Sequence, residues 1–363
     1  MTDLTPTPET SPQPEPEETT PRFLLTVIIP ARNEAASLPS CLSSLVAQSE
    51  PGFALDSEWQ LLVVDDHSTD ATASIAASYP GVTLLHAPYW DQTTRGAFTG
   101  KNNACWAGAQ AAEGRLLLFT DADTIHEPGS LSRARHELAR YNVSLLSYSP
   151  RQLTSGFWQR ALMPLVFAEL AIAYPPKQVN DPASPIAAAN GQFLLVAQQD
   201  YFDLGGHRAV APQVLEDVAL ARNFKRARRT LRFRYAADAL STRMYRTTAD
   251  MMEGWTKNLA LLFPSLIPLA LLRLLDLILF LGLPLLALYP FFTTLQRGLI
   301  LLVWARVLWR IYARIAKSNF PAADCTLAVL GLPLFIGLLL RSYQQVKLRK
   351  SVSWKGRDYP IRH

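Results

Sequence analysis

The feature that most constrains the fold is a regular alternation of short apolar runs and helix-like stretches between Phe23 and Arg234. Five apolar runs have strand length and are rich in Val, Ile and Leu: 23–30, 59–66, 82–86, 115–120 and 144–149. Helical patterns fill the intervals at 33–47, 69–78, 101–112 and 128–141. Near-continuous apolar strands that alternate with helices are typical of a parallel sheet covered on both faces. The sequence therefore predicts an α/β fold with a mostly parallel sheet.

Polar side chains follow three of these runs at the points where the strands are expected to end. Asn33 and Glu34 follow the first run, residues 65–68 the second, and Asp121 and Asp123 the fourth. In open α/β sheets, ligands bind beyond the carboxyl ends of the strands. We therefore expect these three clusters to line one rim of the sheet.

Asp121 and Asp123 form the most specific of the three clusters. An extended chain places residues two apart on the same side, where two carboxylates repel each other and are costly to bury. A divalent cation removes both problems, since Mg²⁺ typically binds one or two carboxylates together with substrate phosphates. The pattern predicts a Mg²⁺ or Mn²⁺ site. The alternative interpretation is a turn that starts the next helix.

Two further motifs have both a functional and a structural interpretation. Asp65 and Asp66 can accept the imide N–H of uracil, whereas Ser68 is also a plausible helix cap. Lys101 stands at the start of a predicted helix, where the backbone favours anions, so it suits a phosphate group. A solvated lysine on an ordinary helix remains the alternative for that position.

Two later motifs also have both a functional and a structural interpretation. Glu216 and Asp217 begin a predicted helix, where acidic residues stabilise any helix, but a carboxylate there can also act as a general base. Trp255 and Lys257 share a polar segment next to apolar sequence, and the terminal SVSWKGRDYPI (351–361) repeats that combination. Both segments suit either contact with phosphate or acceptor, or anchoring at a membrane interface.

The last third of the chain is strongly apolar. Segment 259–292 exceeds the roughly 20 residues that cross a bilayer, and its Arg273 and Asp276 are spaced to pair. Segment 298–317 carries a stripe of arginines that suits an interfacial helix, and the shorter 325–340 is followed by basic residues. These basic residues place the C-terminus in the cytoplasm. We expect two spans, with the third segment lying in the interface or re-entering.

Composition completes the expected organisation. Residues 1–21 are rich in Pro, Glu and Thr and predict a disordered tail. We place the catalytic domain at 22–258, membrane helices at 259–343, and a basic cytoplasmic tail with the WKGR segment at 344–363. Segment 157–174 is apolar and suits either an interfacial or a buried core helix.

Charge and cysteine content narrow the function classes. The net charge of +5 is mild, although residues 222–234 hold seven basic side chains that suit lipid headgroups or diphosphates. No nucleic-acid-binding motif accompanies this patch. The three scattered cysteines give neither a disulfide framework nor a zinc site.

Taken together, these motifs resemble family 2 glycosyltransferases with the Rossmann-like, A-type nucleotide-sugar fold. The matching segments occur in the order VIIPARNE (27–34), VVDDHSTD (63–70), GKNNA (100–104), FTDADT (119–124), NGQFLLV (190–196) and LED (215–217). The apolar C-terminal third and MYRTTADMMEGWTKNL are similar to a narrower branch. It includes the diaponeurosporenoate (carotenoid acid) and hopanoid-associated glycosyltransferases, whose cytoplasmic catalytic domain is tied to the inner membrane.

The resemblance implies roles for particular residues. It implies a nucleotide-lining set with Glu34 near the ribose: Pro30, Ala31, Asn33 and Glu34. It further implies that Asp66 holds uracil, that Lys101 approaches the phosphates, and that Asp121 and Asp123 serve the metal, Asp123 most directly.

The remaining implied roles concern transfer to the acceptor. Asp217 would deprotonate the acceptor in a single inverting displacement, with Glu216 able to share or take that role, and Trp255 and Lys257 would lie at the acceptor end. EGWTKN (253–258) replaces the Q-x-x-R-W motif of processive synthases, which argues against a polymerase.

The sequence thus predicts an inverting, metal-dependent glycosyltransferase that moves a sugar from a UDP-sugar to a membrane lipid such as a carotenoid or hopanoid. Two alternatives stay open. A membrane-bound nucleotidyltransferase is expected to have a glycine-rich basic loop after the first strand, which PARNEAAS (30–37) lacks. A non-catalytic membrane scaffold would not require carboxylates at every expected position.

Overall fold

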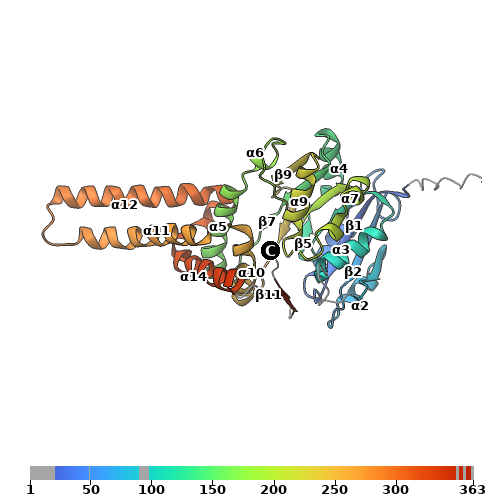
Figure 1. Ribbon diagram of the computed structural model, residues 1–363, viewed down its shortest axis with the longest axis horizontal. Coiled ribbons are helices and arrows are strands. Elements are labelled where there is room, and N and C mark those ends of the chain that lie inside the picture. Colours follow the sequence, from blue (N-terminus) through green and yellow to red (C-terminus); the bar gives the residue numbers. More distant parts are fainter. Residues whose placement is uncertain (1–20, 49, 90–97, 349–350, 355–356, 361–363) are drawn as a thin grey trace, which may run out of the picture.

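The protein has an α/β body and a helical part from which a long helix hairpin projects (Figure 1). The computed structural model describes residues 21–48, 50–89 and 98–348, together with the backbone of 351–354 and 357–360. The predicted N-terminal tail, apart from its last residue, lies outside the described residues, as do Lys355 and Gly356 of the WKGR segment.

A seven-stranded sheet in the order β3-β2-β1-β4-β8-β6-β9 forms the centre of the body. Its strands are β1 (Phe23–Ala31), β2 (Trp59–Asp65), β3 (Val82–His86), β4 (Gly114–Phe119), β6 (Leu145–Ser149), β8 (Leu194–Ala197) and β9 (Leu231–Tyr235). Only β8 runs antiparallel to its neighbours in this described sheet. The predicted mostly parallel α/β fold is confirmed.

Alternate residues of β1 pack against helices on opposite faces of the sheet. Val27 and Ile29 belong to the core shared with α1 (Leu38–Val46), whereas Ile28 belongs to the core shared with α3 (Gly100–Gln110). The first face also carries α2 (Thr72–Ser78) and α4 (Ser130–Arg140). The second face also carries α6 (Pro176–Val179), α7 (Gln198–Asp203) and α9 (Glu216–Arg226). Helix α8 (Gly206–Ala209) lies beside α3. Burial on both faces explains why the strand sequences are continuously apolar.

A small second sheet closes the body beside the strand ends. It has the order β5-β10-β7 and consists of β5 (Thr124–His126), β7 (Arg151–Gln152) and β10 (Leu240–Thr242). β5 begins directly after the Asp121–Asp123 segment, so this sheet fixes the direction in which that segment leaves the main sheet.

The helical part is built on α5 (Gly156–Ala173), whose residues 161–169 are all buried. It packs with α10 (Thr248–Leu262) and α14 (Leu332–Tyr343) in one hydrophobic cluster. Of the two interpretations of segment 157–174, the structure therefore supports the buried core helix. Short elements complete this part: Ala316–Ser318, α13 (Ala322–Cys325), Ala328–Gly331 and Gln344–Leu348.

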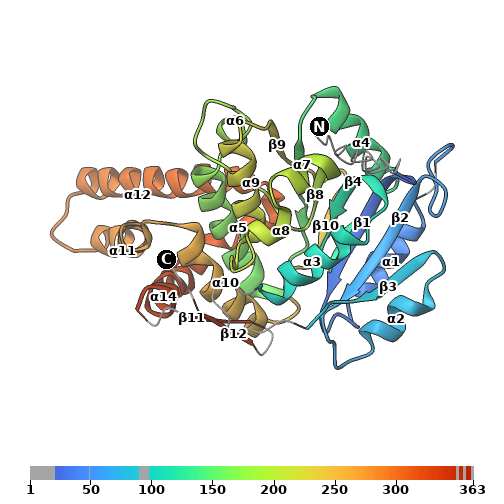
Figure 2. The same cartoon turned by 45° about the vertical axis from the view of Figure 1, so that its right-hand side comes forward.

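The projecting hairpin consists of α11 (Leu266–Ala287) and α12 (Thr294–Ile315), which run side by side (Figures 1 and 2). The apolar segment 259–292 is therefore not one helix. It breaks after Leu262, where Pro264 removes a backbone donor, and α10 continues through the boundary expected at 258/259. Arg273 and Asp276 pair as predicted, at 2.9 Å.

Two stretches among the described residues, Leu266–Ala287 and Ala328–Leu348, are long and apolar enough to cross a membrane. They differ in burial, since the apolar window of the first is 22% buried and that of the second 44%. The second stretch packs against α5 and α10. The predicted tail continues the helical part and then forms an antiparallel hairpin of β11 (Ser351–Trp354) and β12 (Arg357–Pro360) beside α10 (Figure 2).

Candidate active site

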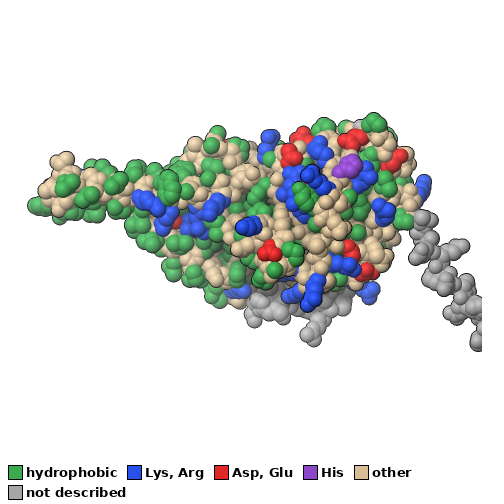
Figure 3. All heavy atoms as spheres, turned by 90° about the horizontal axis from the view of Figure 1, so that it is seen from above, with side chains coloured by type: hydrophobic (Ala, Val, Ile, Leu, Met, Phe, Trp, Pro, Cys, Tyr) green, Lys and Arg blue, Asp and Glu red, His purple; other side chains and the backbone are tan. Residues whose placement is uncertain are grey.

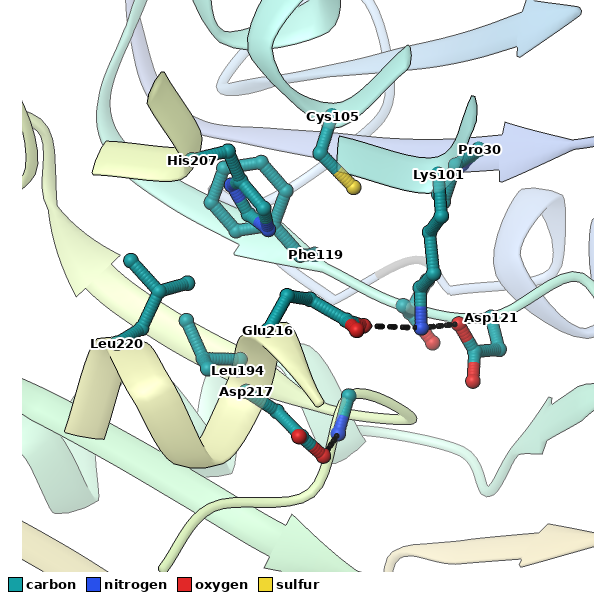
Figure 4. Close-up of a pocket in the computed structure, with 12 residues that line it drawn as sticks. Pro30, Lys101, Cys105, Phe119, Asp121, Leu194, His207, Glu216, Asp217 and Leu220 are labelled. Atoms are coloured by element: carbon teal, nitrogen blue, oxygen red, sulfur yellow. Dashed lines mark hydrogen bonds and ion pairs between the residues drawn. The ribbon is translucent and has the colours of Figure 1, made fainter. Parts of the chain in front are cut away.

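A small cavity of about 10 Å³, close to the volume that one water molecule needs, lies beyond the carboxyl ends of β1 and β4. The N-terminal turns of α3 and α9 and the loop before β8 complete its wall (Figure 4). Its lining includes Pro30, Lys101, Asp121, Gly191, Glu216 and Asp217. Segments from the whole length of the body therefore meet at the predicted rim.

Lys101 is the central cation of this cavity. Its Nζ lies 2.8 Å from Asp121 Oδ1 and 2.7 Å from Glu216 Oε1, so it links the end of β4 to the start of α9 (Figure 4). Burial alone lowers the pKa of Lys101, but Asp121 and Glu216 outweigh burial and hold the pKa well above its ordinary value. We call Lys101, Asp121, Glu216 and Asp217 the strand-end cluster.

Two asparagines that the sequence analysis left without a role hold Lys101 in place. The buried Asn102 donates through Nδ2 to the carbonyl oxygens of Val210, Ala211 and Gln213, each at 3.0 Å. Asn103 donates to the carbonyl oxygen of Pro88 at 2.7 Å. They fix the first turn of α3 against two loops that are distant in sequence, and the available signal was their place beside Lys101 in the GKNNA motif (100–104).

Asp217 has the carboxyl group with the most distinctive environment. Its Oδ2 accepts the Gly191 N–H at 2.9 Å and its Oδ1 accepts the Val218 N–H at 2.7 Å. Burial, reinforced by the neighbouring Glu216, raises the pKa of Asp217 to about 7, although Lys101 opposes the shift. A carboxyl group with a pKa near the working pH is suited to general base catalysis.

Gly191 keeps the cavity open. A Cβ atom at this position would lie 2.9 Å from Lys101 Nζ and 3.2 Å from Glu216 Oε1. Any other residue would push into the strand-end cluster. The NGQ motif around Gly191 belonged to the family resemblance, but its steric function becomes visible only in the folded chain.

The Asp121–Asp123 segment does not continue β4 as an extended strand. β4 ends at Phe119, and the Thr124 N–H donates to the Asp121 carbonyl oxygen at 3.2 Å, which closes a turn. The premise that alternation places both carboxylates on one side is therefore wrong. Both carboxylates act on the same thiol, since the pKa of Cys41 is raised by burial first and then by Asp123, Asp121 and Glu34.

Within the described ranges, no group of three or more His, Cys, Asp or Glu residues is arranged to hold a metal ion. A cation that shares its coordination with substrate phosphates needs only one or two carboxylates. Asp121 in the cavity wall and Asp123 two residues later have hard oxygen donors of the correct type. Asp121 Oδ1 lies 2.8 Å from Lys101 Nζ, so a bound cation would share or replace this contact.

The residues after β1 and β2 are joined to each other. The Asn33 N–H donates to Ser68 Oγ at 3.0 Å, and Asn33 Oδ1 accepts the Thr69 N–H at 2.8 Å. Asp65 is buried and accepts the Ser68 N–H at 3.3 Å. Asn33, Asp65 and Ser68 therefore shape the loops.

The neighbouring positions lie in the same two loops. The Ala31 carbonyl oxygen accepts the Asp66 N–H at 2.8 Å, Asp66 itself is buried, and the Glu34 N–H donates to Thr72 Oγ1 at 2.8 Å. Pro30 alone of the nucleotide-lining set borders the cavity described above.

The two predicted residues on α10 lie in different environments. Burial lowers the pKa of Lys257 to about 8, and Glu216, Lys101, Asp121 and Asp217 all act on it electrostatically, so it belongs beside the strand-end cluster. Trp255 is instead buried in the core of the helical part, where it packs on Phe167 and its indole N–H donates to Met163 Sδ at 3.3 Å. The structure does not bring Trp255 to the cavity.

Comparison with known proteins agrees with this geometry. The family described as "Glycosyl transferase family 2" matches residues 26–194, which include β1 from Thr26 onward, β2 to β4, Lys101, Asp121 and Asp123. The chain carries a family 2 glycosyltransferase domain. The match ends at the start of β8, so Glu216 and Asp217 lie beyond it.

Two relatives of this glycosyltransferase have the same printed name, 4,4'-diaponeurosporenoate glycosyltransferase. The protein of Staphylococcus haemolyticus (strain JCSC1435) is 26% identical over 348 residues, which cover 93% of this chain and 89% of that protein. The protein of Staphylococcus aureus (strain USA300) is 28% identical over 244 residues, which cover 65% and 60% respectively. The prediction of a family 2 glycosyltransferase similar to the carotenoid branch is confirmed.

Among solved structures, the mannosyltransferase PcManGT from Pyrobaculum calidifontis, determined with GDP-Man and Mn²⁺, is similar with a TM-score of 0.51 and 17% identity. The match covers 93% of this chain and 91% of that protein. At this identity the similarity concerns the fold.

Proposed function

We propose that this glycosyltransferase moves a single sugar from a UDP-sugar to a lipid acceptor at the membrane, with inversion at the anomeric carbon. The observation that supports the proposal best is the strand-end cluster, in which Asp217, with a pKa raised to about 7, lies beside Lys101 and Asp121 at one cavity. A base, a cation and acidic groups at one rim are the components that displacement of a diphosphate requires.

In the proposed reaction, Asp217 accepts the proton of the acceptor hydroxyl while the acceptor oxygen bonds to the anomeric carbon. The bond between that carbon and the diphosphate oxygen breaks, and UDP leaves with the electron pair. Glu216 keeps the pKa of Asp217 high, and Lys101 and Lys257 provide positive charge for the diphosphate. Because Lys101 already contacts two carboxylates, donor binding would exchange one of these contacts for a phosphate.

Asp121 and Asp123 would hold a divalent cation, Mg²⁺ or Mn²⁺, together with the diphosphate. When bound, such an ion supplies charge neutralisation of the leaving group. The similar mannosyltransferase was solved with Mn²⁺, which supports the choice of ion.

The nucleotide would lie against the loops after β1 and β2. Pro30 borders the cavity, the Ala31 carbonyl oxygen accepts the Asp66 N–H, and Asn33 and Ser68 connect the two loops. We assign the uracil to the pair Asp65 and Asp66, and the ribose to Glu34. We assign no substrate contact to Trp255, because its burial in the helical core removes it from the cavity.

The acceptor class follows from the relatives and from the helical part. Both relatives are named for diaponeurosporenoate, a carotenoid acid, and a carotenoid, hopanoid or similar lipid is the acceptor we propose. Such an acceptor lies in the bilayer, which accounts for the apolar helices. The proposed location is the cytoplasmic membrane, with the α/β body on the cytoplasmic side where nucleotide sugars are available.

The decisive experiment measures label transfer in isolated membranes. Several radiolabelled UDP-sugars and GDP-mannose are supplied with Mn²⁺ or with EDTA, carotenoid and hopanoid extracts are added, and products are partitioned into organic solvent. We expect organic-phase label from one UDP-sugar, lost with EDTA and in Asp123→Ala, but kept in the surface control Glu253→Ala. Transfer from GDP-mannose alone, or release of pyrophosphate instead of UDP, would contradict the proposal.

A further inference from the structure

The hairpin of α11 and α12 exposes large apolar side chains over its outer half (Figure 3). Leu288, Phe291 and Leu295, at the turn, are 76%, 83% and 75% exposed. Exposed apolar surfaces of this extent mark interaction sites in proteins. We therefore expect an apolar partner to cover this part of the hairpin.

The inner half of the hairpin is tied to the body by buried charges. Glu169 of α5 accepts two hydrogen bonds from Arg314 of α12, at 2.8 and 2.5 Å, and lies 3.6 Å from Arg273 of α11. Asp276, which is 1% exposed, pairs with Arg273 and also with Arg310. We call these five residues the hairpin-base cluster.

The sequence predicted an interfacial helix from the arginine stripe of segment 298–317, and the structure adds the partners of these arginines. Arg310 and Arg314 both contact buried carboxylates. The cluster contains three arginines and two carboxylates, so one positive charge is left over. The base of the hairpin is therefore both rigid and positively charged.

The surplus charge reaches the surface on one side of α12. The Arg310 side chain remains 48% exposed, and the exposed Arg306, four residues earlier and thus on the same face, lies over the Trp309 ring at 4.2 Å. Trp309 is itself 62% exposed. Figure 3 shows Lys and Arg side chains gathered where the apolar hairpin meets the body. Arginine and tryptophan beside an apolar surface are typical of the headgroup level of a membrane.

The distance from Arg306 to the tip of the hairpin sets the depth to which the hairpin can insert into a membrane. Residues 294–305 of α12 lie beyond Arg306 and extend about 18 Å at 1.5 Å per residue, whereas a hydrocarbon core is about 30 Å thick. Arg297, near the tip, donates to the carbonyl oxygens of Tyr289 and Pro290 at 3.4 Å, so part of its hydrogen bonding is met within the hairpin. The apolar part fits into the bilayer without crossing it.

We propose that the α11–α12 hairpin inserts into an anionic bilayer without crossing it, and that Arg306 and Arg310 bind the lipid phosphates at its base. A second copy of the chain is a poorer occupant. In a two-fold symmetric dimer the same face of each copy meets the other, and the Arg306 and Arg310 side chains of the two copies would repel each other. The inference concerns membrane binding and is tested separately from sugar transfer.

The first test compares vesicles of phosphatidylcholine with vesicles that also contain phosphatidylglycerol. The full chain, purified in detergent and diluted into vesicles, is expected to bind the anionic vesicles more tightly. Arg306→Gln should weaken that binding about fivefold, in line with the contribution of one basic residue near an anionic surface, and leave binding to neutral vesicles unchanged. Arg115→Gln, the same charge change on the exposed surface of β4, is the control. Equal binding to both vesicles, or an equal effect of both variants, would overturn the proposal.

The second test measures depth with Phe291→Cys in sealed vesicles. The native cysteines Cys41, Cys105 and Cys325 are buried, and replacing them with Ser or Ala gives a clean background. A membrane-impermeant maleimide should fail to label the new thiol from outside or from the lumen, and should label it after detergent is added. Labelling from the lumen would show a crossing hairpin. Protection in detergent together with a dimeric mass would show that a second copy covers the tip. Either this result or labelling from the lumen would contradict the proposal.

Discussion

The strand-end cluster and the hairpin-base cluster both contain buried charges, yet only the strand-end cluster borders the cavity described above. In the hairpin-base cluster both carboxylates face arginine side chains from two helices, and the geometry is closed. The strand-end cluster borders a cavity, and its Asp217 is held by two backbone N–H groups. Buried charge alone therefore does not identify an active site.

The two clusters also differ in whether they leave space and a mobile proton for a reaction. At the strand ends, Gly191 preserves space, and the raised pKa of Asp217 leaves a proton that can move near neutral pH. At the hairpin base, burial and pairing serve to join α5, α11 and α12. We expect substitutions in the first cluster to reduce rate and those in the second to reduce stability.

The largest effect on rate is expected for Asp217→Asn. Removing a general base typically costs 10²- to 10⁴-fold, and the amide keeps the size of the side chain. The measurement is the initial rate of transfer to a hydroxyl-bearing lipid, with circular dichroism to check folding. Glu216→Gln is the matched comparison, with a smaller loss expected. A loss below about tenfold in Asp217→Asn would indicate an acceptor that is already ionised, such as a carotenoid acid, or a different base.

The largest effect on stability is expected for Glu169→Ala. It leaves Arg273 and Arg314 without this carboxylate, and breaking a buried ion pair costs about 3–5 kcal/mol. Denaturant unfolding in detergent measures the change. Asp324→Asn, which removes the more exposed pair with Arg160, should cost about 1 kcal/mol or less. Similar losses in the two variants would mean that the hairpin-base cluster contributes no more than a surface pair.

Gly191→Ala tests the space at the strand ends. The added methyl group meets Lys101 Nζ at 2.9 Å and Glu216 Oε1 at 3.2 Å, so the cluster must rearrange. We expect kcat/KM to fall about tenfold or more with little change in unfolding free energy. Gly298→Ala, on α12, meets no atom within 4 Å and should behave as the parent protein. Unchanged kinetics in Gly191→Ala would remove the cavity from the proposed site.

The smallest effect on rate is expected from a change of pH. Asp217 must be deprotonated to act as a base, and burial raises its pKa to about 7, so the rate should be constant above about pH 8 and fall on acidification. Near pH 6 we expect about one tenth of the plateau rate, because about one tenth of the carboxyl groups is then ionised. In Asp217→Asn this limb should disappear from the residual activity. A limb that persists would assign the titration to another group.

Much of the body was predictable because its signals are local. The strand at 59–66 and the helix at 101–112 agree with β2 and α3 within two residues at each end, since burial on both faces dictates apolar runs. The same local rules placed Lys101, Asp121 and Asp217 at element ends. Their participation in transfer stays a prediction. The arginine stripe on α12 was visible in the sequence, but its buried carboxylate partners are on other helices, so the pairing was not.

What the sequence by itself determined is the alternation of strands and helices up to residue 149, the fold class and the family, because apolar periodicity and short motifs are properties of neighbouring residues. The tertiary structure decided which charges meet. Lys101 and Glu216 are 115 positions apart and Glu169 and Arg314 are 145 apart, yet each pair is in contact. It also decided that Asp121 and Asp123 lie in a turn and that Trp255 is in the core. Such contacts depend on how whole elements pack, and no local pattern encodes that packing.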